Sequence, residues 1–261
     1  MGFIGKYWLP LLWMISSSLK TPAEVFQQDF HWLPEVPRWD NYKEVWSDSE
    51  VTMAQGYLNS IYITFFSIVF KLFFASLAAY AFAKIDFKGR GVIFMIFLST
   101  MMIPTEVTLI PRFMLFKELG LYNTRWAIIL PNWFAPGAVF MLRQFYMGLP
   151  NDLMEAAKID GAGHTRIFAQ ILLPLTKAAL VSQCVLSFVS CWNEYMAPLV
   201  FLVKKNLYTV AQVVQWTMMD EAARTDLTMA ASTCAIIPVV IIFMFCQRYF
   251  VEGIATSGVK G

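Results

Sequence analysis

The chain has 261 residues, of which 58% are hydrophobic and 15% are charged, and its mean hydropathy is +0.55. One water-soluble core cannot bury this much apolar surface, so the composition predicts a protein that uses lipid as a solvent. The net charge of +2 is too small for the concentrated basic surface that binds nucleic acid. Composition and charge therefore argue against an ordinary soluble domain and against a nucleic-acid partner.

Apolar segments long enough to cross a membrane recur along the chain. A helix needs roughly 20 mostly apolar residues to span the hydrocarbon layer. Five segments satisfy this requirement, and a sixth, at the N-terminus, is at the lower limit. We therefore predict an all-α, polytopic membrane protein with six transmembrane helices in a single domain, residues 1–261. The expected spans are residues 3–19, 58–83, 92–110, 126–142, 178–203 and 227–250.

The first apolar segment, residues 3–19, has two interpretations. Lys6 precedes an apolar stretch, as in a cleavable signal peptide, but no small-residue cleavage site precedes the polar Lys20, which favours a membrane helix. Residues 20–56 contain prolines and tryptophans and are too polar for hydrocarbon. We expect this segment outside the membrane, with its tryptophans in the headgroup layer. Contact with a solute-delivery protein is the alternative.

The remaining connections favour a topology with both termini in the cytoplasm. Residues 84–90 form a short turn dense in basic residues, which the positive-inside rule assigns to the cytoplasm. The segments expected outside hold as many Lys and Arg residues, but in longer loops. Residues 116–126 and 204–226 are expected outside the membrane, the second as a surface helix. The tail, residues 247–261, is short, Gly-rich and polar, which predicts a frayed end.

A polar segment with helical character, residues 143–177, lies between the fourth and fifth expected spans. Asp152 is placed to cap a first helix, with a Glu three residues further on, and Gly161 supplies the left-handed residue that commonly ends one. A second helix over residues 165–172 is expected to stop at Pro174. This helix-turn-helix is too polar to enter the membrane and predicts a docking element.

The surface chemistry of this element fits a basic protein partner. Small Ala side chains allow close approach, and Glu155 and Asp160 add negative charge. Apolar contact area is expected from Leu153, Met154, Ile159, Ile167 and Phe168. An amphipathic helix that rests on the inner leaflet is the alternative, but it would favour Lys and Arg on its polar face.

The docking element also carries a specific signature, because residues 155–174 have the sequence EAAKIDGAGHTRIFAQILLP. The Glu-Ala-Ala triplet, the Gly six residues after the Glu, and Ile171, Leu173 and Pro174 reproduce the EAA signature of permease subunits in bacterial ATP-binding-cassette (ABC) importers. With the Leu-Pro pair at 149–150 and the closing Gly-Val-Lys-Gly, the chain most resembles the carbohydrate-importer branch, to which the smaller permease of the maltose transporter belongs.

The resemblance implies the type I ABC importer permease fold in the bacterial cytoplasmic (inner) membrane, with residues 143–177 as a cytoplasmic coupling segment. It implies a second permease in a heterodimer, an ABC ATPase dimer and an extracytoplasmic solute-binding protein as partners. The implied ATPase contacts are Glu155, Ala156, Ala157, Asp160, Gly161, Thr165 and Phe168. Residues 257–261 are expected to reach between the ATPase subunits, as an alternative to fraying. Family members usually carry more residues before a sequence such as 13–20, so a truncated N-terminus or a late start codon is expected.

No feature of the chain predicts catalysis or a cofactor. No GxxxxGK[ST] loop is present, so ATP and Mg are expected on the partner ATPase. The four cysteines lie in apolar runs with no CxxC pair, which predicts packing residues rather than a disulfide or a metal site. The two histidines, His31 and His164, belong to no paired catalytic constellation, and we do not expect an enzyme.

Polar residues inside spans are costly and tend to face a protein interior or a water-filled cavity. The Trp-Asn-Glu sequence at 192–194 looks like the Trp-Asn-Asp/Glu element of carbohydrate permeases, and sugars need hydrogen-bond arrays and aromatic faces. The expected pathway residues are Asn132, Trp133, Asn193, Glu194 and Tyr195. Hydrogen bonds across helices and simple packing are the alternatives. Lys71 is expected either to pair with a buried carboxylate or to snorkel.

We therefore expect a permease subunit of an ABC importer that translocates a sugar or oligosaccharide by alternating access, coupled to ATP hydrolysis in a partner subunit. The alternative cargo is glycerol phosphate or another delivered solute, which a cluster of Lys or Arg in the pathway would favour. The spans offer only Lys71 and, at the margin of the third span, Arg112. A secondary transporter is a further alternative. It predicts inverted halves or repeated broken helices and leaves residues 155–174 unexplained.

Overall fold

The computed structural model describes residues 2–27, 31–48, 50–219 and 224–258. Within these ranges the chain forms helices and no strand, which confirms the all-α prediction. The longer helices are α1 (Gly2–Ser17), α4 (Met53–Lys84), α5 (Arg90–Ser99), α6 (Thr105–Glu118), α8 (Pro136–Met147), α12 (Lys177–Trp192), α14 (Val210–Met218) and α15 (Thr225–Gly258). The shorter ones are α2 (Pro22–Val25), α3 (Asp40–Lys43), α7 (Trp126–Ile129), α9 (Asp152–Ile159), α10 (His164–Ile167), α11 (Leu173–Leu175) and α13 (Met196–Phe201). Single 3-10 or π turns lie at Glu44–Asp48, Thr100–Met102, Leu130–Trp133, Phe168–Leu172 and Lys205–Leu207.

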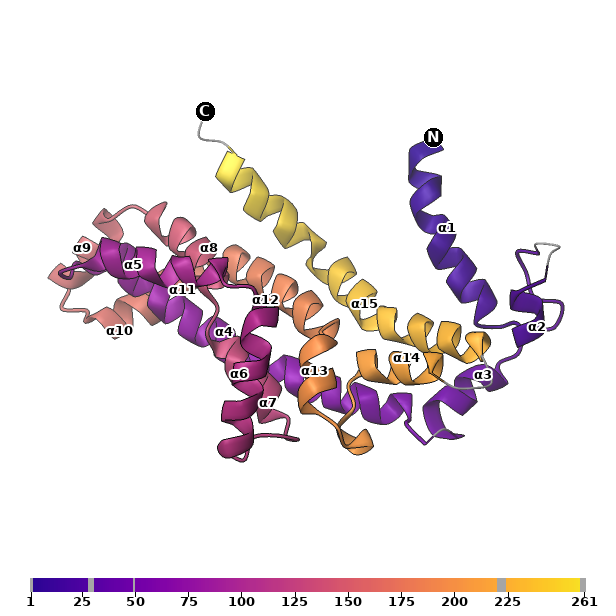
Figure 1. Cartoon of the computed structure of the whole chain (residues 1–261). Coiled ribbons are helices and arrows are strands. Elements are labelled where there is room, and N and C mark those ends of the chain that lie inside the picture. The colour runs from indigo at the N-terminus through magenta and orange to yellow at the C-terminus, as the bar shows by residue number, and fades with distance from the viewer. Residues whose placement is uncertain (1, 28–30, 49, 220–223, 259–261) are drawn as a thin grey trace.

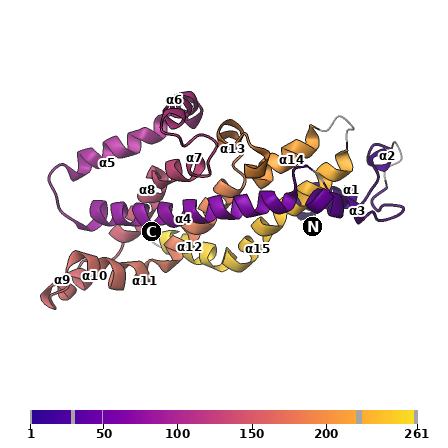
Figure 2. The same cartoon turned by 90° about the horizontal axis from the view of Figure 1, so that it is seen from below.

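Helix α4 forms the long axis of the molecule and runs from the α3 end to the end that carries α5 and α9 (Figures 1 and 2). It begins where Thr52 Oγ1 accepts a hydrogen bond from the Gln55 amide (3.3 Å) and ends at Lys84, after which Ile85 is extended. At about 1.5 Å per residue, its 32 residues exceed the roughly 30 Å hydrocarbon core of a bilayer. Helices α8, α12 and α14 pack along it.

Two helical segments are long and apolar enough to cross a membrane on their own, α4 and Thr225–Gln247 of α15. Two more spans result if each bent pair of helices is one span. These pairs are Arg90–Met102 with Thr105–Glu118, and His164–Leu175 with Lys177–Trp192. The described residues therefore contain two to four spans by length and composition, and the expected number of six stays a prediction.

The third expected span, residues 92–110, is wrong as a single helix. Helix α5 ends at Ser99, a 3-10 turn follows, and α6 begins only at Thr105, bent by 94° from the preceding helix. Ile103 and Pro104 between them are extended. The cause is local, because a proline ring displaces the residue before it from the helical region.

The fourth and fifth expected spans, residues 126–142 and 178–203, are also broken. Ala135 precedes Pro136 and has a non-helical backbone, so α7 and its 3-10 turn are separated from α8. In the fifth, a break separates α12 from α13. There Glu194 Oε1 accepts a hydrogen bond (3.0 Å) from a backbone amide in the first turn of α13.

The expected surface helix within residues 204–226 is instead part of the packed interior. Helix α14 packs against both α4 and α15, and Val210 and Val213 are at most 1% exposed. A Cβ added to Gly56 of α4 would lie 2.7 Å from Val213 Cγ2. The two helices approach this closely because Gly56 has no side chain.

Helix α15 extends farther than expected. It continues to Gly258, so the prediction of a frayed tail from residue 247 is wrong over most of its length. The expected contact of residues 257–261 with the ATPase falls partly on residues 259–261, which lie outside the described residues.

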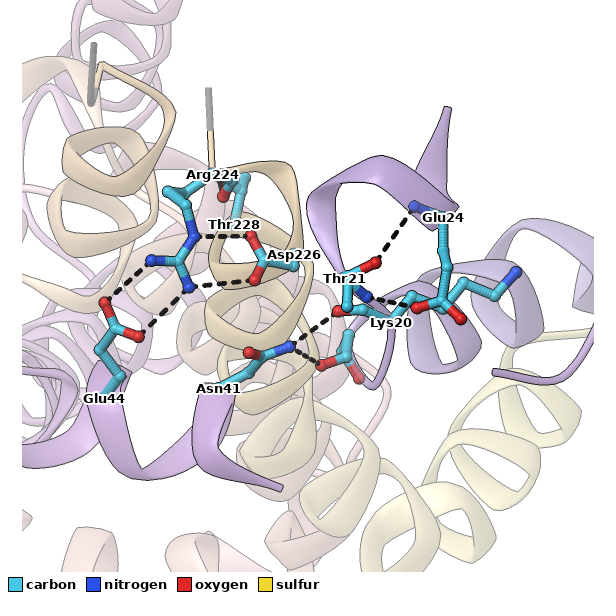
Figure 3. Close-up of polar contacts among 9 residues, drawn as sticks. Lys20, Thr21, Glu24, Asn41, Glu44, Arg224, Asp226 and Thr228 are labelled. Carbon is cyan, nitrogen blue, oxygen red and sulfur yellow. Dashed lines mark hydrogen bonds and ion pairs between the residues drawn. The ribbon is translucent and has the colours of Figure 1, made fainter. Parts of the chain in front are cut away.

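At the α3 end, Arg224, Glu44 and Asp226 form a charged cluster that we call the Arg224 clasp (Figure 3). Arg224 donates two hydrogen bonds of 3.1 Å to Asp226 and two of 3.2 and 3.3 Å to Glu44. Asp226 is fully buried, and the hydrogen bonds to Asp226, ahead of those to Glu44, raise the pKa of Arg224. Nearby, Asn41 Nδ2 donates to two backbone carbonyls that follow α1 (3.0 and 3.1 Å). The clasp thus fixes the start of α15 to the segment after α3.

We predict that Arg224→Ala lowers the free energy of unfolding by about 3 kcal/mol, because it leaves the buried carboxylate of Asp226 without its cation. Thermal unfolding in detergent, followed by tryptophan fluorescence, measures the change. Adding Asp226→Asn is expected to recover most of the loss. Arg38→Ala is the control, since Arg38 is exposed. Equal melting temperatures for the two arginine variants would contradict the role of the clasp.

Candidate functional site

Two short helices, α9 and α10, lie at the end of the molecule opposite the Arg224 clasp (Figures 1 and 2). Helix α9 ends at Ile159, and Gly161 has a φ of +79°. The Ala162 amide donates to the Ala157 carbonyl (2.9 Å), and the Gly161 amide donates to the Lys158 carbonyl (3.0 Å). These two bonds define a Schellman helix end. The predicted left-handed turn at Gly161 is confirmed.

The start of α9 differs from the expectation. The helix begins at Asp152, so Asn151 occupies the capping position, but it makes no capping hydrogen bond. Its side-chain oxygen accepts a hydrogen bond from Lys84 Nζ instead (2.7 Å). The prediction of Asp152 as the cap is therefore wrong. Asp152 is the first helical residue, where a carboxylate still interacts favourably with the helix dipole.

The second helix continues past its expected stop. Helix α10 leads through the π turn Phe168–Leu172 into α11, so Pro174 does not end the helix at Leu172. Pro174 lies in the first turn of α11, a position where the missing N–H of proline is tolerated. The chain bends by 77° only between Leu175 and Lys177.

Side chains of α4 hold the two short helices in place. Lys84 Nζ donates a second hydrogen bond, to the Leu149 carbonyl (2.7 Å). One turn earlier on α4, the Tyr80 hydroxyl lies 3.0 Å from His164 Nδ1, and the centroid of its ring lies 5.5 Å from that of Phe168. Both α9 and α10 are thereby attached to the same end of α4.

A shared hydrophobic core reinforces this attachment. Met154 and Ala157 of α9 and Ile167 of α10 are at most 9% exposed, and they pack in one cluster with Leu142 and Tyr146 of α8. The expectation that Met154 and Ile167 offer apolar contact area to a partner is therefore wrong. The chain's own helices already cover that face, and an amphipathic pattern does not specify what covers its apolar side.

The opposite face of α9 and α10 is open, and we call it the docking face. Of the residues expected to contact an ATPase, those exposed are Glu155, Ala156, Asp160, Gly161 and Thr165. Ala157 is buried, and Phe168 is half-buried against Tyr80. Leu153 and Ile159 are 45% and 87% exposed. The docking face thus combines carboxylates, small residues and two uncovered apolar side chains, a mixture suited to contact with another protein.

Two of the expected pathway residues, Asn132 and Trp133, lie in the 3-10 turn between α7 and α8. Asn132 Nδ2 donates to the Ile128 carbonyl (2.9 Å), within its own helical turn. The ring centroid of Trp133 lies 4.5 Å from that of Phe70 and 5.3 Å from that of Phe74. These contacts are of the packing kind, and a role in substrate contact stays a prediction.

The other three, Asn193, Glu194 and Tyr195, lie at the break between α12 and α13. Asn193 is exposed, and the other two are half-buried. The Glu194 carboxylate, which caps α13, is also within electrostatic reach of Arg112 on α6. The structure therefore brings a predicted site residue close to a basic residue that the sequence pattern left at the margin of a span.

A cavity of about 650 Å³ lies between α4, the α5–α6 break, the α7–α8 break and α12. Of the five expected pathway residues, all of which the structure describes, none lines it. Its polar lining residues are Lys71, Thr100, Thr105, Thr108, Arg112 and Gln183. Two sequence features together point to this cavity. Helix-breaking prolines, among them Pro131 and Pro136, occur in the same apolar segments as, or close to, basic residues.

The sequence profile of the family described as "Binding-protein-dependent transport system inner membrane component" matches residues 71–256. The chain belongs to this family. This permease is 36% identical over 262 residues to the arabinooligosaccharides transport system permease protein AraQ of Halalkalibacterium halodurans, covering 100% of this chain and 93% of that protein. It is 32% identical over 241 residues to the sn-glycerol-3-phosphate transport system permease protein UgpE of Yersinia pestis, covering 90% and 86%. A chain of a solved bacterial ABC transporter that imports the acidic polysaccharide alginate matches with a TM-score of 0.83 and 27% identity, over 95% of this chain and 92% of that one.

The family membership confirms the predicted class of protein. Like its relatives, the permease is a transport subunit of an ABC importer and not an enzyme. Such transporters work with an ATPase and a solute-binding protein. Across the part of the chain that the structure describes, no group of three or more His, Cys, Asp or Glu residues is placed to hold a metal ion.

Lys84→Met is expected to loosen the docking face, because it removes both 2.7 Å hydrogen bonds between α4 and the start of α9. A loss of about 2 kcal/mol would speed amide exchange in α9 by roughly tenfold or more. Hydrogen exchange of the purified permease measures this. Lys88→Met, at an exposed position in the next turn, is the control. Unchanged exchange in Lys84→Met would show that these bonds do not hold the helix.

Gly161→Val is expected to weaken the turn after α9 by about 1–2 kcal/mol, because a β-branched residue resists a positive φ. A Cβ at this position would meet nothing within 4 Å, so backbone strain rather than a clash causes the loss. Gly161→Asn is the matched control, since Asn tolerates the left-handed region. Hydrogen exchange of α9 compares the two variants, and equal protection in both would rule out the strain.

Proposed function

We propose that this permease forms half of the translocation pathway for a sugar or oligosaccharide. It would do so as one domain over residues 1–261, with six spans and both termini in the cytoplasm. A second permease supplies the other half in a heterodimer, and an extracytoplasmic solute-binding protein delivers the solute. An ATPase dimer binds ATP and Mg and drives the cycle. The observation that carries the proposal is the docking face, which is open on one side and anchored to α4 and α8 on the other.

In this proposal the ATPase contacts the docking face directly. Glu155 and Asp160 supply negative charge to a basic groove, and Ala156 and Gly161 let the partner backbone approach closely. Ile159 and Leu153 add apolar area that water would otherwise cover. Thr165 adds a polar contact at the edge of this surface. Ala157, which is buried, supports the face from beneath, and the exposed part of the half-buried Phe168 stays a candidate contact.

The attachment to α4 supports a mechanism of rigid transmission. Closure of the ATPase dimer around ATP would move the docking faces of the two permeases together. Because α9 and α10 share a packed core with α4 and α8, these helices would move with them. The cavity between the permeases would then change from inward-facing to outward-facing, a rigid-body transition between two states. ATP biases this equilibrium through its tighter binding to the closed dimer.

The named relatives favour a carbohydrate as the cargo. The more similar of the two relatives named above carries the name of an arabinooligosaccharide permease, and the matching solved transporter imports a polysaccharide. Glycerol phosphate is the second candidate, since a relative with 32% identity carries that name. Within this proposal, Asn193 and Tyr195 at the α12–α13 break are candidate substrate contacts together with Asn132, Trp133 and Glu194.

Glu155→Lys is expected to weaken the association with the ATPase by roughly tenfold, because it reverses a charge at the centre of the docking face. Membrane insertion and folding are expected to stay intact, since Glu155 is exposed. The measurement is the yield of ATPase that co-purifies with tagged permease from membranes, together with ATP-driven sugar uptake. Glu118→Lys, an exposed charge reversal on α6, is the control. Undiminished ATPase yield with Glu155→Lys would overturn the proposed contact.

A further inference from the structure

The cavity of about 650 Å³ has the size of a small-molecule site and lies at the breaks of two helical segments. Lys71 reaches it from the middle of α4, and Arg112 reaches it from α6. Irregular backbone at membrane depth is tolerated where it lines protein or a water-filled space. The breaks at Pro104 and Pro136 therefore fit a cavity that holds water or a polar solute rather than lipid.

The cavity has an excess of positive charge. Among the described residues, neither Lys71 nor Arg112 forms an ion pair within 4.0 Å. Glu194 is within electrostatic reach of Arg112, but it does not line the cavity and already accepts a backbone hydrogen bond. Glu106, on the first turn of α6, is exposed and also lies outside the lining. Lys71 and Arg112 carry two positive charges, and the carboxylate of Glu194 balances one of them. One positive charge at the cavity is therefore left for a ligand to neutralise.

The guanidinium of Arg112 is only partly satisfied by the chain itself. Its carbon lies 5.1 Å from the centre of the Phe201 ring, and its buried Nε has no hydrogen-bond partner. A buried charged donor without an acceptor is costly. A carboxylate is the ligand that the guanidinium fork binds best, since it can accept two parallel hydrogen bonds.

The rest of the lining combines three threonines and Gln183 with apolar residues, among them Met101, Ile103 and Phe134. The Thr100 and Thr108 hydroxyls donate to backbone carbonyls of their own helical turns (2.7 and 2.8 Å), so their oxygens keep lone pairs that can accept hydrogen bonds. Gln183 adds an amide from α12. These groups suit a solute that carries many hydroxyls of its own.

We propose that this cavity binds a sugar that carries a carboxylate, that is, a uronic-acid unit, with Lys71 and Arg112 holding the carboxylate and the threonines contacting the hydroxyls. The inference rests on the proposed function, because it narrows the cargo of the same importer. A carboxylate brings one negative charge, which matches the excess charge of the cavity. A phosphate monoester, at about −1.5 to −2 near pH 7, would exceed it.

The test uses the complete importer, with its second permease and ATPase, in lipid nanodiscs without the solute-binding protein, so that the membrane subunits and not the binding protein select the ligand. Calorimetry compares galacturonate, which carries one carboxylate, with neutral galactose and with glycerol 3-phosphate. We expect galacturonate to bind roughly tenfold more tightly than galactose. Equal affinity for the two sugars would overturn the inference, and so would tighter binding of glycerol 3-phosphate than of galacturonate.

Charge-removing variants locate the site. Lys71→Gln and Arg112→Gln are each expected to weaken galacturonate binding by roughly tenfold and to leave galactose binding unchanged. Lys71→Arg, which keeps the charge, is expected to retain most of the affinity. Lys117→Gln, an exposed change on α6 outside the cavity, is the control. Unchanged galacturonate binding in both glutamine variants would overturn the assignment.

The two proposals fail in different ways. If the ATPase co-purifies and neutral sugar is transported, but the charge of the ligand makes no difference, only the inference about the cavity fails. If no ATPase associates with the permease at all, the proposed function fails, and the inference fails with it. Co-purification of the ATPase with Lys71→Gln and Arg112→Gln also checks that these variants fold and assemble.

Discussion

The attachment of α9 and α10 to helix α4 is the constraint on which the rest of this permease depends. Lys84 binds two oxygen acceptors at the start of α9, and Tyr80 contacts α10 through His164 and Phe168. The apolar sides of both short helices also enter the core formed by α4 and α8. Because packed interiors transmit strain, the docking face cannot shift without these helices. A flexible loop with the same exposed residues could bind a partner, but movement of the partner would deform the loop instead of moving α4 and α8.

Helix α4 carries this constraint along the molecule. At its far end α14 packs against it so closely that Gly56 has no room for a side chain. Helix α14 in turn packs against α15, whose start is held by the Arg224 clasp. Removing one member of a buried ionic cluster costs far more than the cluster contributes by itself. The Arg224 clasp is therefore better understood as a device that specifies the position of α15 than as a source of stability.

The helix breaks within the expected spans also create the cavity that Lys71 and Arg112 line. An unbroken helix satisfies its own backbone and presents only side chains, whereas a proline leaves carbonyls open and redirects the chain. The bend of 94° between α5 and α6 places Arg112 and three threonines around one space with Lys71 of α4. The breaks that make three of the expected spans discontinuous are thus the ones that shape this cavity. A bundle of straight, unbroken helices would lack it.

The sequence by itself determined the features that depend on neighbouring residues. The long apolar helix α4 and the left-handed turn at Gly161 each follow from residues within a turn or two, which is why they were predicted correctly. Only the tertiary structure decided which side of α9 faces the chain itself, since periodicity marks an apolar face without naming what covers Met154 and Ile167. The convergence of Lys71 and Arg112 likewise joins residues far apart in the chain. Their meeting is decided by helix breaks and packing, which no local pattern encodes.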